Sequence, residues 1–402
     1  MPPSTEELLG RLLEGVEREL PSAVALRHRL HAHPELAHAE KQTAAAVAQE
    51  LPVAAVPAAG TGLIARVGPG GLPAVAVRAE LDGLPVHERT GAEFSARGDA
   101  MHACGHDVHM AALVALTRAA QGVGDALPAQ LIAVFQPSEE DYPSGAEQLA
   151  GAELAEVRPA GVVAAHVHPE LPWGSAAIDP GTVNASCDYA EITVVGAPSH
   201  GAYPHRGRDP ILAISQIVVA LHALVSRRID PLHPAVLTVG VLEGGGAGNV
   251  IPESARALAA LRAHRAEDRL TLRTLVAEVA AGVAAAHGCR ARVELVPGEP
   301  ALENDPTIAT RARELLPIAG LAPAGEWRSC GSDDFAFYGA LAPIAMAFVG
   351  LDGAEGFAPR PLHHPELLPP DSAVGAVARA QAVLFLAAAG STDAALSTAG
   401  PE

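Results

Sequence analysis

Histidine, cysteine and glutamate gather at four places in this chain of 402 residues, and these residue types bind metals. The densest group is MHACGHDVH at 101–109, in which one glycine separates Cys104 from His106. A thiolate and an imidazole at this spacing can face one cation if the chain turns sharply, and Gly105 permits such a turn. Both donors suit zinc, and imidazole also suits other transition metals. The alternative interpretation is a buried cysteine beside a histidine that begins a helix.

The second group is acidic and directly follows an apolar run that predicts a buried strand. Residues 136–141 read QPSEED, so Glu139 and Glu140 come just after Pro137. Because proline ends the strand, the carboxylates fall at its carboxyl end, where open α/β sheets place their sites. One carboxylate can bind a metal while the other takes a proton from a metal-bound water. A solvated acidic loop is the alternative.

The third and fourth groups are pairs of histidines. His166 and His168 stand at the end of another apolar run, and His363 and His364 lie near the C-terminus. The alternatives are a polar residue at a strand end for the first pair and a surface loop for the second. Together the four groups offer about five soft or carboxylate ligands, enough for two metal ions that share a water roughly 3.5–4 Å apart.

Hydrophobic periodicity predicts the elements that must position these groups. Helices are expected over residues 6–20, 21–33, 39–51 and 107–121. Strands are expected over residues 63–68, 74–80, 130–136, 161–166 and 343–350. Strands that alternate with helices predict an α/β sheet covered on both faces.

The middle of the chain predicts a second, smaller domain. Its expected elements are a strand at 189–196, a helix at 208–228, strands at 235–244 and 254–262, a helix at 266–287 and a strand at 291–296. The order β-α-β-β-α-β is that of a ferredoxin-like α+β domain. We therefore expect a discontinuous main domain, 1–185 and 298–402, with residues 186–297 inserted into it.

Composition limits the partners and the location of the protein. The formal net charge of -19 at pH 7 excludes a phosphate-backbone partner, so no nucleic acid is expected. The four cysteines are far apart, and the charged N-terminus has no apolar core of a secretory signal. The late apolar run 373–390 contains Arg379, which indicates a buried core helix rather than a membrane span. A cytoplasmic protein without membrane contact is therefore expected.

Nine stretches in order resemble the aminoacylase/carboxypeptidase family of metal amidohydrolases. That family includes hippurate hydrolases, N-acyl-amino-acid aminoacylases and indoleacetyl-amino-acid hydrolases. The stretches are LRHRLHAHPEL, RAELDGLPVHERTG, MHACGHDVHMAAL, FQPSEE, HVHPELPWG, SHGAYPHRGRDPI, NVIPESA, GSDDFAFY and LHHPEL.

The resemblance implies a role for each matching residue. The implied metal ligands are Cys104, His106, Glu140, His166 and His363. Glu139 matches the general base, which deprotonates the bridging water and then protonates the leaving amine. His200 matches a histidine that polarises the scissile carbonyl and can come from a dimer partner. Asn249 matches a residue near the substrate.

The same resemblance implies cofactors, substrates and partners. Two divalent ions per subunit are expected, zinc or manganese, with nickel or cobalt as alternatives. The implied fold is a metallopeptidase-like α/β domain with an inserted lid and dimerisation domain, and the implied assembly is a homodimer. The expected reaction is hydrolysis of N-acyl-L-amino acids, with a dipeptidase or carboxypeptidase as the alternative. Two alternatives belong to other functional classes. One is a thiol hydrolase with Cys104 as nucleophile, and the other is a binding protein without catalysis.

The chain departs from the family at several positions. Glu80 stands where the family usually has aspartate, whereas Asp82 is retained, and both are expected to orient ligands. Asp333 replaces a usual glutamate, so its role stays open. Asp107 is expected to form a hydrogen bond with a ligand imidazole, and His109 to serve the structure.

Overall fold

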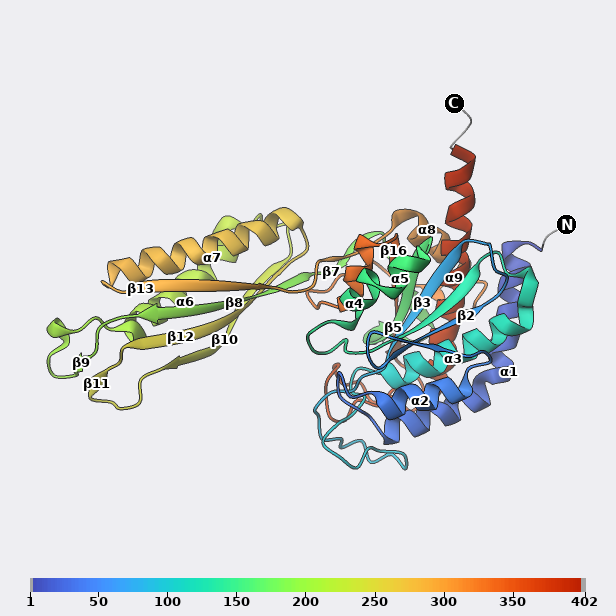
Figure 1. Ribbon diagram of the computed structural model, residues 1–402, viewed down its shortest axis with the longest axis horizontal. Coiled ribbons are helices and arrows are strands. Elements are labelled where there is room, and N and C mark those ends of the chain that lie inside the picture. The colour runs from blue at the N-terminus through green and yellow to red at the C-terminus, as the bar shows by residue number, and fades with distance from the viewer. Residues whose placement is uncertain (1–2, 399–402) are drawn as a thin grey trace. The chain divides into compact units, whose positions relative to one another are not determined.

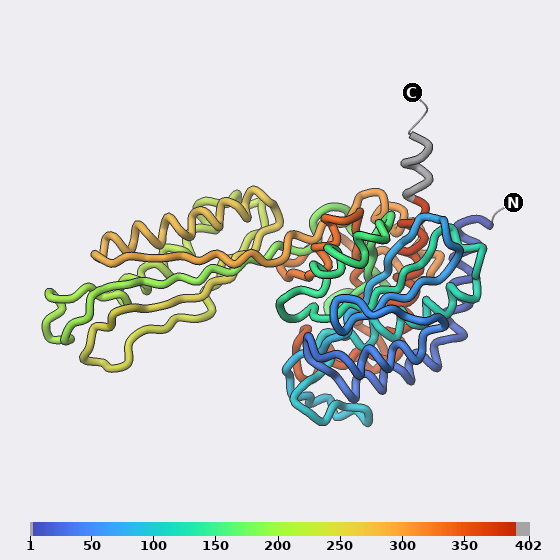
Figure 2. Tube along the Cα trace, viewed as in Figure 1, coloured from blue at the N-terminus to red at the C-terminus, as the bar shows by residue number. Residues whose placement is uncertain are grey.

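The computed structural model describes residues 3–398, apart from the side chains of 391–398. The chain divides into two compact units (Figure 1). The first unit contains the residues up to Gly181, Glu303–Trp327 and the residues from Phe337 onward, and the second contains Thr182–Leu302 and Arg328–Ala336. The tube in Figure 2 follows the chain from the first unit into the second and back.

The first unit is built on a mixed sheet of eight strands. Their order is β1 (Val56–Ala58), β2 (Gly62–Val67), β4 (Gln130–Gln136), β3 (Ala74–Glu80), β5 (Gly161–Pro172), β16 (Ile344–Asp352), β6 (Ser175–Ala177) and β15 (Ala322–Pro323). The neighbours β4, β3, β5 and β16 run parallel, so their carboxyl ends meet at one edge. The predicted α/β sheet is confirmed, and this edge is where such sheets place their sites.

Helices cover this sheet. They are α1 (Thr5–Ala32), α2 (Lys41–Glu50), α3 (His106–Val123), α4 (Gly145–Gly151), α5 (Glu153–Val157), α8 (Pro306–Leu315) and α9 (Ser372–Thr398). α3 and α9 pack directly on the sheet, and α1 packs on both of these helices (Figure 1). Alternate apolar residues of β3, β4, β5 and β16 share one buried core with them, as the period of two in a strand requires.

One expectation about the N-terminal region is wrong. The sequence predicts two helices that meet near residue 21, but α1 continues through Pro21 without interruption. Proline removes one backbone donor from the helix. The buried stripe nevertheless runs on from Leu12 and Val16 to Leu26 and Leu30, and its packing against α3 offsets the lost hydrogen bond.

Within the part of the chain that the structure describes, two helices are long and apolar enough to cross a membrane on length and composition alone. One is α9, whose window Ser372–Gly390 is 89% buried in the first unit, as expected for a core helix. The other is α6 (Pro210–Arg228) of the second unit, whose window is 33% buried. One face of α6 packs on the sheet of that unit and buries Ala213, Ile214, Ile217, Leu221 and Leu224, whereas Ile211, Leu212 and Val219 of the same helix are exposed.

The second unit has the predicted element order β-α-β-β-α-β. The elements are β8 (Ser186–Val195), α6, β10 (Ala235–Gly244), β12 (Ser254–Ala263), α7 (Ala266–Ala286) and β13 (Arg290–Pro297). The strands form an antiparallel sheet in the order β10-β12-β8-β13. Both helices share one core with alternate residues of β8, so they cover the same face of the sheet. A short ribbon of β9 (Ser199–His200) and β11 (Val250–Ile251) extends this unit.

Candidate metal centre

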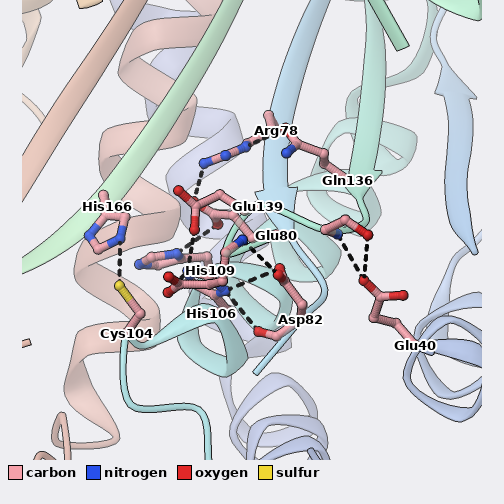
Figure 3. Close-up of polar contacts among 12 residues, drawn as sticks. Glu40, Arg78, Glu80, Asp82, Cys104, His106, His109, Gln136, Glu139 and His166 are labelled. Carbon is pink, nitrogen blue, oxygen red and sulfur yellow. Dashed lines mark hydrogen bonds and ion pairs between the residues drawn. The ribbon is translucent and has the colours of Figure 1, made fainter. Parts of the chain in front are cut away.

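The five ligands implied by the sequence all lie in the first unit. Cys104 Sγ is 3.5 Å from His166 Nε2. His106 Nε2 is 3.9 Å from Glu140 Oε1, and His363 Nε2 is 3.3 Å from the same oxygen. Ligand atoms of Cys104, His106 and Glu140 all lie within 4.8 Å of one another. Figure 3 shows that the side chains of Cys104 and His166 point toward each other.

The sharp turn expected between Cys104 and His106 is present. Gly105 has a φ of 85° and stands at the N-cap position of α3. A Cβ atom there would lie 2.6 Å from Val167 Cγ2, so a larger residue does not fit. The left-handed turn and the close approach to β5 both require glycine.

Both buried histidines of the group present Nε2 to their neighbours. His106 Nδ1 donates to the carbonyl oxygen of Asp82 at 2.8 Å, and His166 Nδ1 donates to that of Val167 at 2.6 Å. These acceptors fix a proton on Nδ1, so Nε2 is the nitrogen of each ring that would present a lone pair to a bound metal. Among the described residues, buried His106 Nε2 and Glu140 Oε1 have no hydrogen-bond partner. A cation between these two atoms would satisfy both.

The electrostatics of the group also favour a cation. Burial alone would lower the pKa of His106, but the carboxylates of Glu80, Asp82 and Glu140 raise it to about 10. The same negative field that stabilises an imidazolium would stabilise a bound metal ion. Burial, together with the nearby His109, lowers the pKa of His166 well below its usual range, so this ring stays neutral. The donor set therefore fits divalent cations such as zinc.

Asp82 contacts two of the candidate ligands. Its carbonyl oxygen accepts from His106, and its carboxylate Oδ2 accepts the backbone N–H of Glu140 at 2.9 Å. Burial would raise the pKa of Asp82, but its hydrogen bonds to His106 and to the backbone lower it, so it remains a carboxylate. Asp82 thus orients His106 and the loop of Glu140, as such partners of metal ligands do.

Glu80 acts on His166 through a second histidine. His109 Nδ1 donates to Glu80 Oε2 at 2.8 Å, and His109 Nε2 accepts the backbone N–H of Val167 at 3.0 Å. Arg78 pairs with the same glutamate (Figure 3). Both nitrogens of His109 are therefore engaged. Its ring fixes the backbone beside His166 and is not available as a ligand.

The structure separates the members of each histidine pair. His166 faces Cys104, whereas the ring of His168 packs edge-on against Trp327, with 4.9 Å between centroids. His363 reaches Glu140, whereas His364 Nδ1 accepts the backbone N–H of Glu366 at 3.1 Å.

The expectation for Asp107 is wrong, because its carboxylate points to α1 and not to a ligand imidazole. Its Oδ2 accepts from Arg27 Nε at 2.9 Å and lies 3.0 Å from His31 Nδ1. His31 Nε2 lies 3.1 Å from Glu88 Oε1 on its other side. Sequence reasoning missed Arg27 and His31. Their spacing of four residues on the apolar face of α1 is the signal that could have found them.

The remaining candidates lie in the second unit. The ladder of β9 and β11 pairs His200 with Val250, and Asn249 accepts the backbone N–H of Gly201 through its carbonyl oxygen at 2.7 Å. His200 Nδ1 accepts the backbone N–H of Ala202 at 3.0 Å, so Nε2 carries the proton. The exposed His200 and Asn249 are thus neighbours within one ribbon.

Comparisons with known proteins identify a family. Residues 76–384 match a family model described as Peptidase family M20/M25/M40. The chain is 32% identical over 368 residues to the N-acetyl-L-cysteine deacetylase of Bacillus subtilis (strain 168), covering 90% of this chain and 86% of that protein. It is 33% identical over 352 residues to an IAA-amino acid hydrolase of Arabidopsis thaliana, covering 83% and 78%.

A solved structure is similar in fold as well as in sequence. It is that of a Bacillus subtilis protein described as a dinuclear metal-binding peptidase from the M20 family, with a TM-score of 0.79 and 27% sequence identity to this chain. The similarity covers 92% of this chain and 98% of that one.

Proposed function

Because the chain belongs to peptidase family M20/M25/M40, we propose that it hydrolyses the amide bond of N-acyl-L-amino acids with two divalent metal ions. The observation that carries the proposal is the meeting of a thiolate, imidazoles and a carboxylate beside Glu139 at the carboxyl edge of the sheet. The named relatives deacetylate N-acetylcysteine or hydrolyse IAA-amino acids, which supports this substrate class.

The proposed ligands are Cys104, His106, Glu140, His166 and His363. When bound, the two ions would supply an acidified water and a Lewis acid for the carbonyl. Zinc or manganese is the proposed metal, with nickel or cobalt as alternatives, because thiolate and imidazole are borderline-soft ligands. Cys104 is then a ligand and not a nucleophile.

Glu139 is the proposed general base. Its Oε2 lies 3.9 Å from His106 Nε2, as does Oε1 of the proposed ligand Glu140, so Glu139 lies beside the ligand group. The resemblance to the family, and not this distance, assigns it the role of base. From there it would take the proton of the attacking water and donate it to the departing nitrogen. The C–N bond breaks readily only when that nitrogen is protonated, because an amide anion is a poor leaving group. Glu139 holds the proton it took from the water, so the same carboxylate serves both steps.

His200 and Asn249 are proposed to contact the substrate. Because Ala202 occupies Nδ1 of His200, the Nε2–H is the donor that would stabilise negative charge on the carbonyl oxygen. We propose that residues 186–297 form an inserted lid and dimerisation domain on a catalytic domain of 1–185 and 298–402. His200 would then act in its own subunit or in a partner subunit of a homodimer. A cytoplasmic location completes the proposal.

A substrate screen tests this function. The protein, supplied with Mn²⁺ or Zn²⁺, is incubated with N-acetyl, N-benzoyl and indoleacetyl amino acids and with dipeptides, and released amino acid is measured. The proposal expects hydrolysis of at least one N-acyl series and a loss of that activity in Glu139→Gln. Hydrolysis of dipeptides alone would favour a dipeptidase or carboxypeptidase, and no hydrolysis of any substrate would contradict the proposal.

A further inference from the structure

Glu40 is a fully buried carboxylate that has no part in the chemistry described above. It stands at the N-cap position of α2, yet its side chain does not cap that helix. The capping role belongs to Glu35, whose Oε2 accepts the backbone N–H groups of Gln42 and Thr43 at 2.8 Å each. Another role must therefore account for the burial of Glu40.

One partner of Glu40 comes from the loop that carries the two active-site glutamates, and the other comes from the turn between β1 and β2. Oε1 accepts the backbone N–H of Ser138 at 2.8 Å, and Oε2 accepts the hydroxyl of Thr61 at 2.6 Å. Figure 3 shows Glu40 beside the loop that follows Gln136. Both carboxylate oxygens are thereby used, and one of them fixes the residue that immediately precedes Glu139.

Ser138 needs such fixing because its backbone is left-handed, with a φ of 52°. The neighbouring His38 is also left-handed, with a φ of 66°, and the two residues bind each other. Ser138 Oγ accepts the His38 N–H at 2.9 Å and lies 2.9 Å from His38 Nδ1, while His38 Nε2 donates to the Tyr142 carbonyl at 3.1 Å. Non-glycine residues remain in this region only where surrounding contacts fix them.

The other side of Glu139 is fixed by a second carboxylate. Asp82 accepts the backbone N–H of Glu140 at 2.9 Å. Glu40 and Asp82 thus bind the amides of the residues that flank Glu139 on either side. A short loop fixed at both flanks presents its side chains in one direction, which general-base catalysis and metal binding both require.

We propose that Glu40 is a positioning residue for Glu139 and Glu140. The inference rests on the proposed function, because that function assigns the base to Glu139 and a metal ligand to Glu140. Glu40 acts through the backbone of Ser138 and touches neither substrate nor metal. Its removal releases the left-handed turn, so the base and the ligand move together.

Three variants test this role: Glu40→Ala, Glu40→Gln and the matched control Glu35→Ala. The control removes a carboxylate from the same segment of the chain. Glu35 caps α2 by accepting from Gln42 and Thr43, and Ser138 instead donates its backbone N–H to Glu40. Each protein is loaded with Mn²⁺, and kcat, KM, Mn²⁺ affinity in competition with a chelating dye, and the Tm are measured.

Glu40→Ala is expected to lower kcat or Mn²⁺ affinity by about 10–100-fold, the usual effect of losing a residue that orients ligands, with little change in KM. Glu40→Gln should recover most of both quantities, because its amide oxygen accepts from Ser138 and its NH₂ group reaches Thr61. Glu35→Ala should lower the Tm while kcat and Mn²⁺ affinity stay near wild type. Values for Glu40→Ala that match those of Glu35→Ala would overturn the proposal.

Glu40→Asp covers the case in which the alanine variant does not fold. It keeps the charge but withdraws the carboxylate by about 1.5 Å, so the hydrogen bond to Ser138 weakens and a smaller loss in the same direction is expected. An unchanged kcat and metal affinity in this variant would also contradict the role. If the wild type hydrolyses no N-acyl amino acid, the proposed function fails, and the Mn²⁺ affinities still decide whether Glu40 positions the loop.

Discussion

Replacing His31 by glutamine should remove a pH-dependent part of the stability of the first unit. His31 is fully buried between two carboxylates, with Nδ1 3.0 Å from Asp107 and Nε2 3.1 Å from Glu88. Only the imidazolium can donate from both nitrogens at once. This cluster underlies the first turn of α3, where His106 begins the helix.

The magnitude follows from the shift in pKa. Burial alone would lower the pKa of His31, but Asp107 and Glu88 raise it from 6.5 to about 9. Between these two values the folded protein retains a proton that the unfolded chain has lost. The contribution is therefore complete below about pH 6.5 and disappears as the pH rises through 9. A shift of about 2.5 units corresponds to about 3 kcal/mol in the free energy of unfolding.

Urea unfolding at pH 6 and pH 9.5, in excess EDTA, measures the contribution of protonated His31 to the free energy of unfolding. The control is His87→Gln, because the side chain of His87 is 71% exposed. From pH 6 to pH 9.5, the free energy of unfolding of the wild type and of the control should each fall by about 3 kcal/mol more than that of His31→Gln. Equal losses in all three proteins would refute the reasoning.

Three further predictions concern the site. Glu139→Gln should lower kcat by about 10²–10⁴ without changing the bound metal, as kinetics and metal analysis would show; a loss of metal instead would make it a ligand. His200→Ala should lower kcat by about 10²–10³ at unchanged metal affinity, and a kcat within about threefold of wild type would exclude its role. Gly105→Ala, which requires a left-handed alanine against Val167, should cost roughly 1–3 kcal/mol in thermal unfolding. An unchanged Tm would show that the turn tolerates a side chain.

Sequence alone predicts the elements whose signals are local. The strand Gln130–Gln136 is expected over the same residues, because an apolar run ends at Pro137. The helix expected over residues 107–121 begins at His106, directly after the left-handed turn at Gly105. Cys104, His106 and Glu140 are equally visible, since each stands near the end of such an element. His166 lies within β5, which continues to Pro172 beyond the expected end at 166, and His363 lies in the loop between β16 and α9, so the family motifs identify these two.

The contacts that fix these ligands are not local and could not be predicted. Arg27 and Asp107 are 80 residues apart, and Glu40 and Ser138 are 98 residues apart. No periodicity relates such pairs, because only tertiary packing, such as that of α1 on α3, brings their segments together. The continuous helix through Pro21 has the same cause, since packing against α3 overrides a local signal that ends helices.

The central claim is that divalent ions bound at Cys104 and its neighbours drive amide hydrolysis. The most direct measurement titrates the EDTA-treated protein with Mn²⁺ or Zn²⁺ while it hydrolyses an N-acyl amino acid, at a protein concentration well above the dissociation constant. The account predicts no activity without metal and a rise that saturates at about two equivalents per chain. Activity that survives the removal of metal, as expected if Cys104 were a nucleophile, would contradict it.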